Sequence, residues 1–185
     1  KKRMENEKIF HLDDNAFSYI ESLNKNYKKA SLYQFLGLVF KKEVISNDPI
    51  DVPALQGKMG GKTYYMFSIE PHHLLKTGFV LHRTRVNEME NPTYQRLLVP
   101  ARLRGISKFI DEGGFFANSI IVNFNTDTKV KLAFDVSTSK NLDSRSRHGV
   151  LKIPNMYAIA YIIDGQHRLY GFSNTEQIES STIPV

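Results

Sequence analysis

Cysteine is absent from the 185 residues of this sequence, and so is any apolar run long enough to cross a membrane. Without cysteine the chain forms no disulfide bond and offers no thiolate to a metal ion. Because there is neither a membrane span nor a recognisable signal peptide, we expect a cytoplasmic protein without a membrane partner. The adjacent His72 and His73 have no third ligand at a useful spacing, so the sequence predicts no metal site.

Positive charge is in excess, with a net charge of +6 and an isoelectric point near 9.4. Such a balance favours anionic partners, either nucleic acid or nucleotide. Hydrophobic residues make up 41% and charged residues 24% of the chain, which is ordinary for a soluble domain with a buried core. The chain begins with Lys1 and ends with the strand-like segment Ser181–Val185, so we expect the sequence to continue beyond Val185.

The first 48 residues are expected to be an appendage that is mainly helical. Asp13 or Asp14 is suited to cap a helix that runs to about Lys29, whereas the apolar stretch 31–40 fits either a helix or a strand. The run Ser-Asn-Asp-Pro at 46–49 then interrupts the pattern. We place a domain boundary there, which leaves residues 49–185 as the main domain.

The main domain mixes strands and helices, which predicts the α+β class. In the helix predicted over Pro100–Asp111, the buried stripe is formed by Leu103, Ile106, Phe109 and Ile110. A Gly-Gly pair ends this helix. In chain order we expect a hairpin over 52–69 with its turn at Gly57–Lys62, a helix that starts at Asn91-Pro92, a helix over Pro100–Asp111, strands over Ser119–Phe124 and Lys129–Val136, and a polar loop over 137–149. The glycine-rich turn of the hairpin lacks the spacing of a Walker phosphate loop.

The most informative stretch is the apolar run from Met156 to Ile163 and the five residues after it, Asp-Gly-Gln-His-Arg. Both faces of the run are apolar, which predicts a central strand buried on both sides. Asp164 and Gly165 then predict a turn into a helix that the aspartate caps.

That turn has the makings of an anion site, most naturally for phosphate. Gly165 lets a ligand approach the backbone, Gln166 adds donors, and Arg168 is suited to clamp an oxyanion. His167 is suited to donate a hydrogen bond or move a proton. The alternative is structural: Asp164 only caps, Gln166 and His167 are solvated, and Arg168 pairs with a nearby acid.

Asp164-Gly165-Gln166-His167-Arg168 matches, letter for letter, the motif of the DGQHR-domain family, and the chain resembles the DndB-like DNA-modification proteins in it. More distantly, a strand that leads into a Gly-x-x-Arg helix start resembles the ParB/sulfiredoxin fold, in which this turn holds nucleotide phosphates. Sulfiredoxins have a cysteine where Gln166 stands, so sulfiredoxin chemistry is excluded. The resemblance covers residues 52–185, and Asn91-Pro92 through Arg96 resembles a stretched form of the Asn-Pro-Arg box of ParB proteins.

The resemblance implies a nucleotide-binding protein of a DNA-modification or defence system, with hydrolysis of the nucleotide left open. The expected ligand is a nucleoside triphosphate, ATP or CTP, with Mg²⁺ held by Asp164 or Glu88. His167 is the candidate base within the motif. The candidate phosphate ligands are Gly165, Gln166, His167 and Arg168, with Arg96, Arg83 and Arg85 as further cations.

The alternative function is a non-catalytic DNA-binding regulator of a DNA phosphorothioation gene cluster, as the resemblance to DndB implies. Its expected partners are DNA and other DNA-modification proteins. Arg102, Arg104 and Lys108 lie off the apolar stripe of their helix, and Arg145 and Arg147 lie in the polar loop. These five residues are the candidate contacts to DNA phosphates. No helix-turn-helix spacing that would read bases is present.

Overall fold

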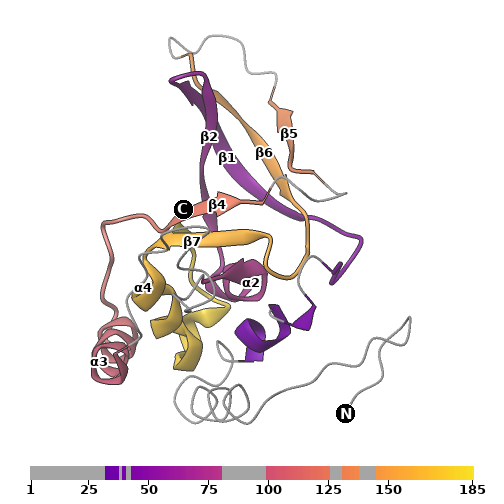
Figure 1. Ribbon diagram of the computed structural model, residues 1–185. Helices are drawn as coiled ribbons and strands as arrows, with labels where there is room; N and C mark the ends of the chain where they lie inside the picture. Colours follow the sequence, from indigo (N-terminus) through magenta and orange to yellow (C-terminus); the bar gives the residue numbers. More distant parts are fainter. Residues whose placement is uncertain (1–31, 38, 41–42, 81–98, 126–130, 138–144) are drawn as a thin grey trace, which may run out of the picture.

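The structure is a computed structural model that describes residues 32–37, 39–40, 43–80, 99–125, 131–137 and 145–185. It confirms the α+β class, with two sheets and short helices packed beside them (Figure 1). The elements are β1 Ile50–Met59, β2 Lys62–Ile69, α2 Pro71–Thr77, β3 Gly78–Phe79, α3 Pro100–Asp111, β4 Ile121–Phe124, β5 Ala133–Val136, β6 Arg147–Ile153, β7 Ala160–Asp164, α4 Gln166–Gly171 and β8 Ile183–Pro184. Two 3₁₀ turns, Phe172–Asn174 and Glu176–Ile178, follow α4.

The larger sheet has five strands in the order β5-β6-β1-β2-β8, and its pairs are antiparallel. The predicted hairpin is confirmed, but its turn is shorter than expected. Lys58 and Met59 are still paired with β2, so only Gly60 and Gly61 turn the chain. Their φ angles of 55° and 75° are those that a tight two-residue hairpin turn requires.

Strand β6 corrects the prediction of a polar loop over 137–149. The strand begins at Arg147, and its residue Leu151 pairs with Val52 of β1. Leu151 and Ile153 are buried, whereas the first residues of the strand lie beyond the core and are polar. Because the strand leaves the core at that end, its sequence there lacks the apolar alternation that identifies a strand.

The smaller sheet has the order β3-β7-β4, with β7 in the centre, parallel to β3 and antiparallel to β4. The central position was predicted correctly, but burial on both sides was not. Ile162 is 1% exposed, whereas Ile163 is 56% exposed. The strand also starts late, at Ala160, because Ala158 has a φ of 54° and turns the backbone.

Helix α3 runs over the predicted residues and packs on α4, and Leu103 and Ile110 are its buried residues. Phe109 was predicted to belong to the buried stripe, and this is wrong: it is 42% exposed and its ring lies against Phe116 at 5.0 Å. Gly113, with a φ of 79°, ends the helix as expected.

Residues 32–37 are helical and contact the main domain through Gln34. The buried Gln34 amide donates to the Gly78 carbonyl at 3.2 Å and accepts the Val80 N–H at 3.3 Å, so it pairs with the backbone as a neighbouring strand would. Further along, Val44 forms a β-bridge with Met156. The boundary near residue 48 stays a prediction, and the helix proposed up to Lys29 lies outside the described residues.

Candidate functional site

The five-residue motif lies where β7 ends and α4 begins, so the predicted strand, turn and helix are confirmed. Gly165 makes the turn with φ 89° and ψ 9°, a left-handed conformation that glycine adopts at little cost. A Cβ on this residue would lie 2.9 Å from Ile120 Cγ1 and 3.3 Å from Arg168 Nη2. The glycine is therefore needed both for its backbone angles and for its small size.

Asp164 does not cap α4, which corrects the prediction. Gly165 occupies the N-cap position, and no side chain bonds to the first turn. The Asp164 carboxylate instead pairs with Arg168, with 3.2 Å between Oδ2 and Nη2. The Arg168 guanidinium also donates to the Asn118 carbonyl, and its side chain is only 18% exposed. Arg168 therefore ties β7 to the segment that leads into β4.

Gln166 is buried rather than solvated, whereas His167 is half-buried and bonds to the start of α3. Gln166 is 6% exposed, and its Nε2 has no hydrogen-bond partner in the described part of the chain. His167 Nε2 accepts the Val99 N–H at 3.3 Å, and Val99 is the residue that precedes α3. Accepting this bond requires Nε2 to carry no proton, so His167 supplies the start of α3 with an acceptor.

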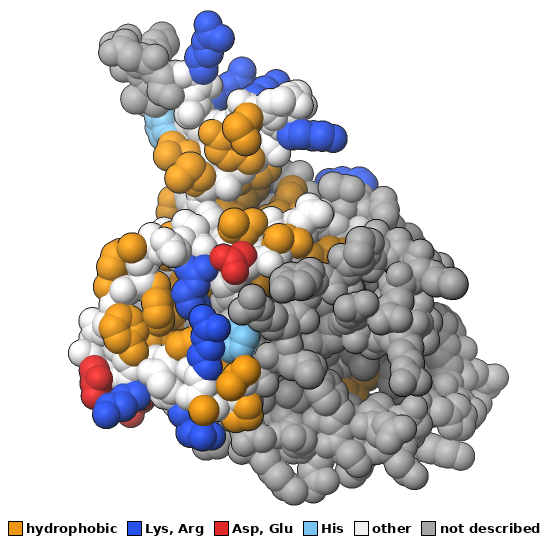
Figure 2. Space-filling model, turned by 60° about the vertical axis from the view of Figure 1, so that its left-hand side comes forward, with side chains coloured by type: hydrophobic (Ala, Val, Ile, Leu, Met, Phe, Trp, Pro, Cys, Tyr) orange, Lys and Arg blue, Asp and Glu red, His pale blue; other side chains and the backbone are white. Residues whose placement is uncertain are grey.

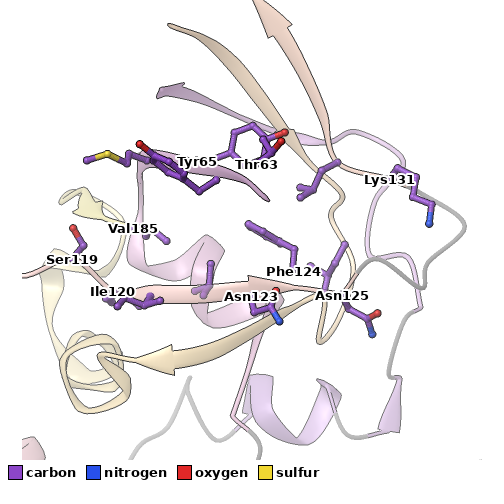
Figure 3. A pocket seen from close by; sticks show the side chains of 15 residues that line it. Thr63, Tyr65, Ser119, Ile120, Asn123, Phe124, Asn125, Lys131 and Val185 are labelled. Atoms are coloured by element: carbon purple, nitrogen blue, oxygen red, sulfur yellow. The ribbon is translucent and has the colours of Figure 1, made fainter. Parts of the chain in front are cut away.

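A groove of about 580 Å³ runs between β2 and β4, beside the motif. Figure 3 shows Phe124 of β4 pointing into the groove and Ser119 near one end, with Lys131 at the other. Thr63 and Tyr65 line it from β2. Asn118, the residue before Ser119, accepts a hydrogen bond from Arg168. One end of the groove therefore lies next to the motif. The sequence did not predict this groove, because its walls come from two different sheets.

Comparison with models of protein families matches residues 52–185 to DndB, described as DNA-sulfur modification-associated. The chain belongs to the DndB family. No curated protein and no solved structure matches the chain. The resemblance to the ParB/sulfiredoxin fold therefore stays a prediction. Among the described residues there is no helix both long and apolar enough to cross a membrane.

In this DndB-family chain the five predicted DNA contacts divide into two groups. Arg102, Arg104 and Lys108 are exposed on α3, although Lys108 Nζ lies 3.6 Å from the Glu112 carboxylate. Arg145 and Arg147 are exposed at the start of β6, and Figure 1 places that end of β6 far from α3. The α3 cations and the β6 cations thus belong to separate surfaces.

The other predicted ligands of a nucleotide, Arg83, Arg85 and Arg96, lie outside the described residues, as does Glu88. No group of three histidine, aspartate or glutamate side chains is close enough to hold a metal ion within the ranges that the structure describes. His72 and His73 lie in α2 with their ring centroids 3.8 Å apart. Burial, and next the neighbouring His72, lower the pKa of His73 below its ordinary value of 6.5.

Proposed function

We propose that this DndB-family protein is a non-catalytic DNA-binding component of a DNA-sulfur-modification system, with other proteins of that system as its partners. The observation that supports this most is the contrast between its arginines. Arg168 is largely buried and is held by Asp164 and the Asn118 carbonyl. Arg102 and Arg104 are exposed, and neither has an acidic partner within the described residues.

The exposed arginines flank the buried side of α3. Leu103 lies between them and packs into the core, so one guanidinium extends on each side of the helix. Phosphate contacts of this kind give affinity without sequence preference and release counterions, so binding weakens as salt rises.

Binding of duplex DNA, followed by fluorescence anisotropy at several salt concentrations, tests the proposal. We expect R102Q/R104Q to bind more weakly and to lower the slope of log affinity against log salt by about 1–2, since each phosphate contact contributes about 0.9. Lys108→Gln is the matched control on the same helix. Its effect should be smaller because Glu112 lies beside Lys108 and repels phosphate. A wild-type protein that binds no duplex DNA would overturn the proposal.

Nucleotide binding at the motif is a second candidate, and one observation favours it. The buried Gln166 Nε2 is a donor without a protein acceptor among the described residues, and such a donor costs about 1–3 kcal/mol unless a ligand satisfies it. A phosphate that used Arg168 would share the guanidinium with the Asp164 carboxylate, whose negative charge repels it. The nucleotide would be ATP or CTP with Mg²⁺.

A further inference from the structure

The larger sheet extends beyond the core as an arm, formed by residues 55–66 of β1 and β2 with residues 145–149 beside them. Ala54 and Phe67 are the last buried pair of the hairpin, and from Lys58 to Tyr64 every residue is exposed. Figure 1 shows β1, β2 and the start of β6 rising away from the helices. Nothing described packs around the end of the arm, so its side chains are available to a partner.

Only one sign of charge is present on the arm. Lys58, Lys62, Arg145 and Arg147 are exposed, and none of them makes a salt bridge in the described part of the protein. Neither residues 52–69 nor residues 145–153 contain an aspartate or a glutamate. Figure 2 shows the lysine and arginine side chains gathered at the top of the molecule, over the arm. A surface with this charge is complementary to a polyanion.

Side chains of the arm pack on one another and on β5. The Tyr64 ring covers Gly57, where a Cβ would overlap the ring atoms. Gln56 donates to the Tyr65 hydroxyl at 3.2 Å, and the Tyr65 ring lies 5.6 Å from that of Phe134 in β5. A ribbon that is already ordered loses little conformational entropy when it binds.

We propose that this arm binds double-stranded DNA by entering the major groove, a proposal that rests on the proposed function. A major groove about 12 Å wide admits a two-stranded ribbon. Directly paired residues share a face of the ribbon and successive residues alternate, so Lys58 and Lys62 lie on opposite faces. Arg147, paired with Gln56, lies on the same face as Lys58. One face of the ribbon therefore carries Lys58 and Arg147 and the other carries Lys62, so cations lie next to the DNA whichever face is turned toward the bases.

The test compares K58Q/K62Q with the wild-type protein in duplex DNA binding at several salt concentrations. We expect the double substitution to lower the salt slope by about 2, because two phosphate contacts are lost. R145Q/R147Q should act in the same direction. Both pairs are exposed, so the melting temperature should not change. Lys108→Gln on α3, whose cation lies beside Glu112, serves as the control elsewhere on the surface.

The outcomes separate this inference from the proposed function. If wild-type protein binds DNA and K58Q/K62Q binds with the same affinity and salt slope, the arm is not the contact surface, and the DNA-binding function stands. If wild-type protein binds no duplex DNA, both are overturned. Binding of the arm to vesicles of anionic lipid, without binding to DNA, would also overturn both. A salt slope lowered in the arm variants supports the inference.

Discussion

At the scale of single residues, the side chains of the motif make contacts that hold neighbouring segments of the fold together. Arg168 joins the end of β7 to Asn118, and His167 supplies the start of α3 with an acceptor. Gly165 provides the backbone angles that bring these side chains together. The sequence alternative in which Arg168 pairs with an acid is what the structure shows. The role of Arg168 in holding a ligand stays a prediction.

We predict that Arg168→Ala lowers the free energy of unfolding by about 1–2 kcal/mol, because a mostly buried, charge-assisted pair of hydrogen bonds is lost. Denaturant titration measures this loss. Asp164→Asn is the milder control, since it keeps a neutral acceptor and leaves the bond to Asn118 intact.

Calorimetric titration of the same variant with ATP or CTP and Mg²⁺ tests the nucleotide candidate. If Arg168→Ala keeps wild-type stability but loses a saturable nucleotide site that the wild type has, the arginine serves the ligand rather than the fold. Absence of nucleotide binding in a wild-type chain that melts cooperatively would remove the second candidate.

The lowered pKa of His73 predicts how the free energy of unfolding depends on pH. Burial keeps its pKa below 6.5 in the folded state, so the unfolded chain binds more protons in the range between the two values. The free energy of unfolding should therefore be greatest above pH 6.5 and decrease as the pH falls through that range. Denaturant titrations over this range should show that His73→Gln loses this decrease, whereas His148→Gln, on β6, retains it. An unchanged pH dependence in His73→Gln would contradict the assignment.

At the scale of elements, the contact between α3 and α4 positions the motif. Ser107 Oγ donates to the Gly171 carbonyl at 2.7 Å, and Ile106 lies so close to Gly171 that a Cβ there would overlap its methyl group. The two helices approach at this point because Gly171 has no side chain.

Two glycines on these helices should respond in opposite ways to alanine. We predict that Gly171→Ala lowers the free energy of unfolding by about 1–3 kcal/mol through overpacking against Ile106. Gly105→Ala is the matched control: it is exposed in α3 with nothing within 4 Å of the added Cβ, and it should stabilise by about 0.5–1 kcal/mol. Thermal or denaturant unfolding measures both. Equal effects of the two substitutions would contradict the close contact.

Elements with a strong signal in adjacent residues were predicted well, whereas a strand that is defined by pairing with a distant segment was not. The hairpin β1–β2, helix α3 and the turn at Gly165 each have their signal in adjacent residues, such as a glycine pair or a proline at a helix start. Strand β6 was missed because its first residues pair with β1 outside the core and so are polar. Helix α2 was missed because it has only seven residues.

At the scale of the whole molecule, the described cations lie in places that no linear pattern brings together. Lys58 and Lys62 join Arg145 and Arg147 on the arm only because β1 pairs with β6 across a long sequence separation. The arm and α3 offer two surfaces to an anionic partner, and the variants on each distinguish their contributions to DNA binding.

By itself, the sequence determined the α+β class, the hairpin, α3, the strand-turn-helix of the motif and the resemblance to the DndB-like family, because these depend on residues close along the chain. Tertiary structure decided the rest. The pairing of Arg168 with Asp164 and Asn118, the acceptance of the Val99 N–H by His167, and the groove between β2 and β4 each join separate segments. Such contacts depend on how the two sheets pack, which no local pattern of residues specifies.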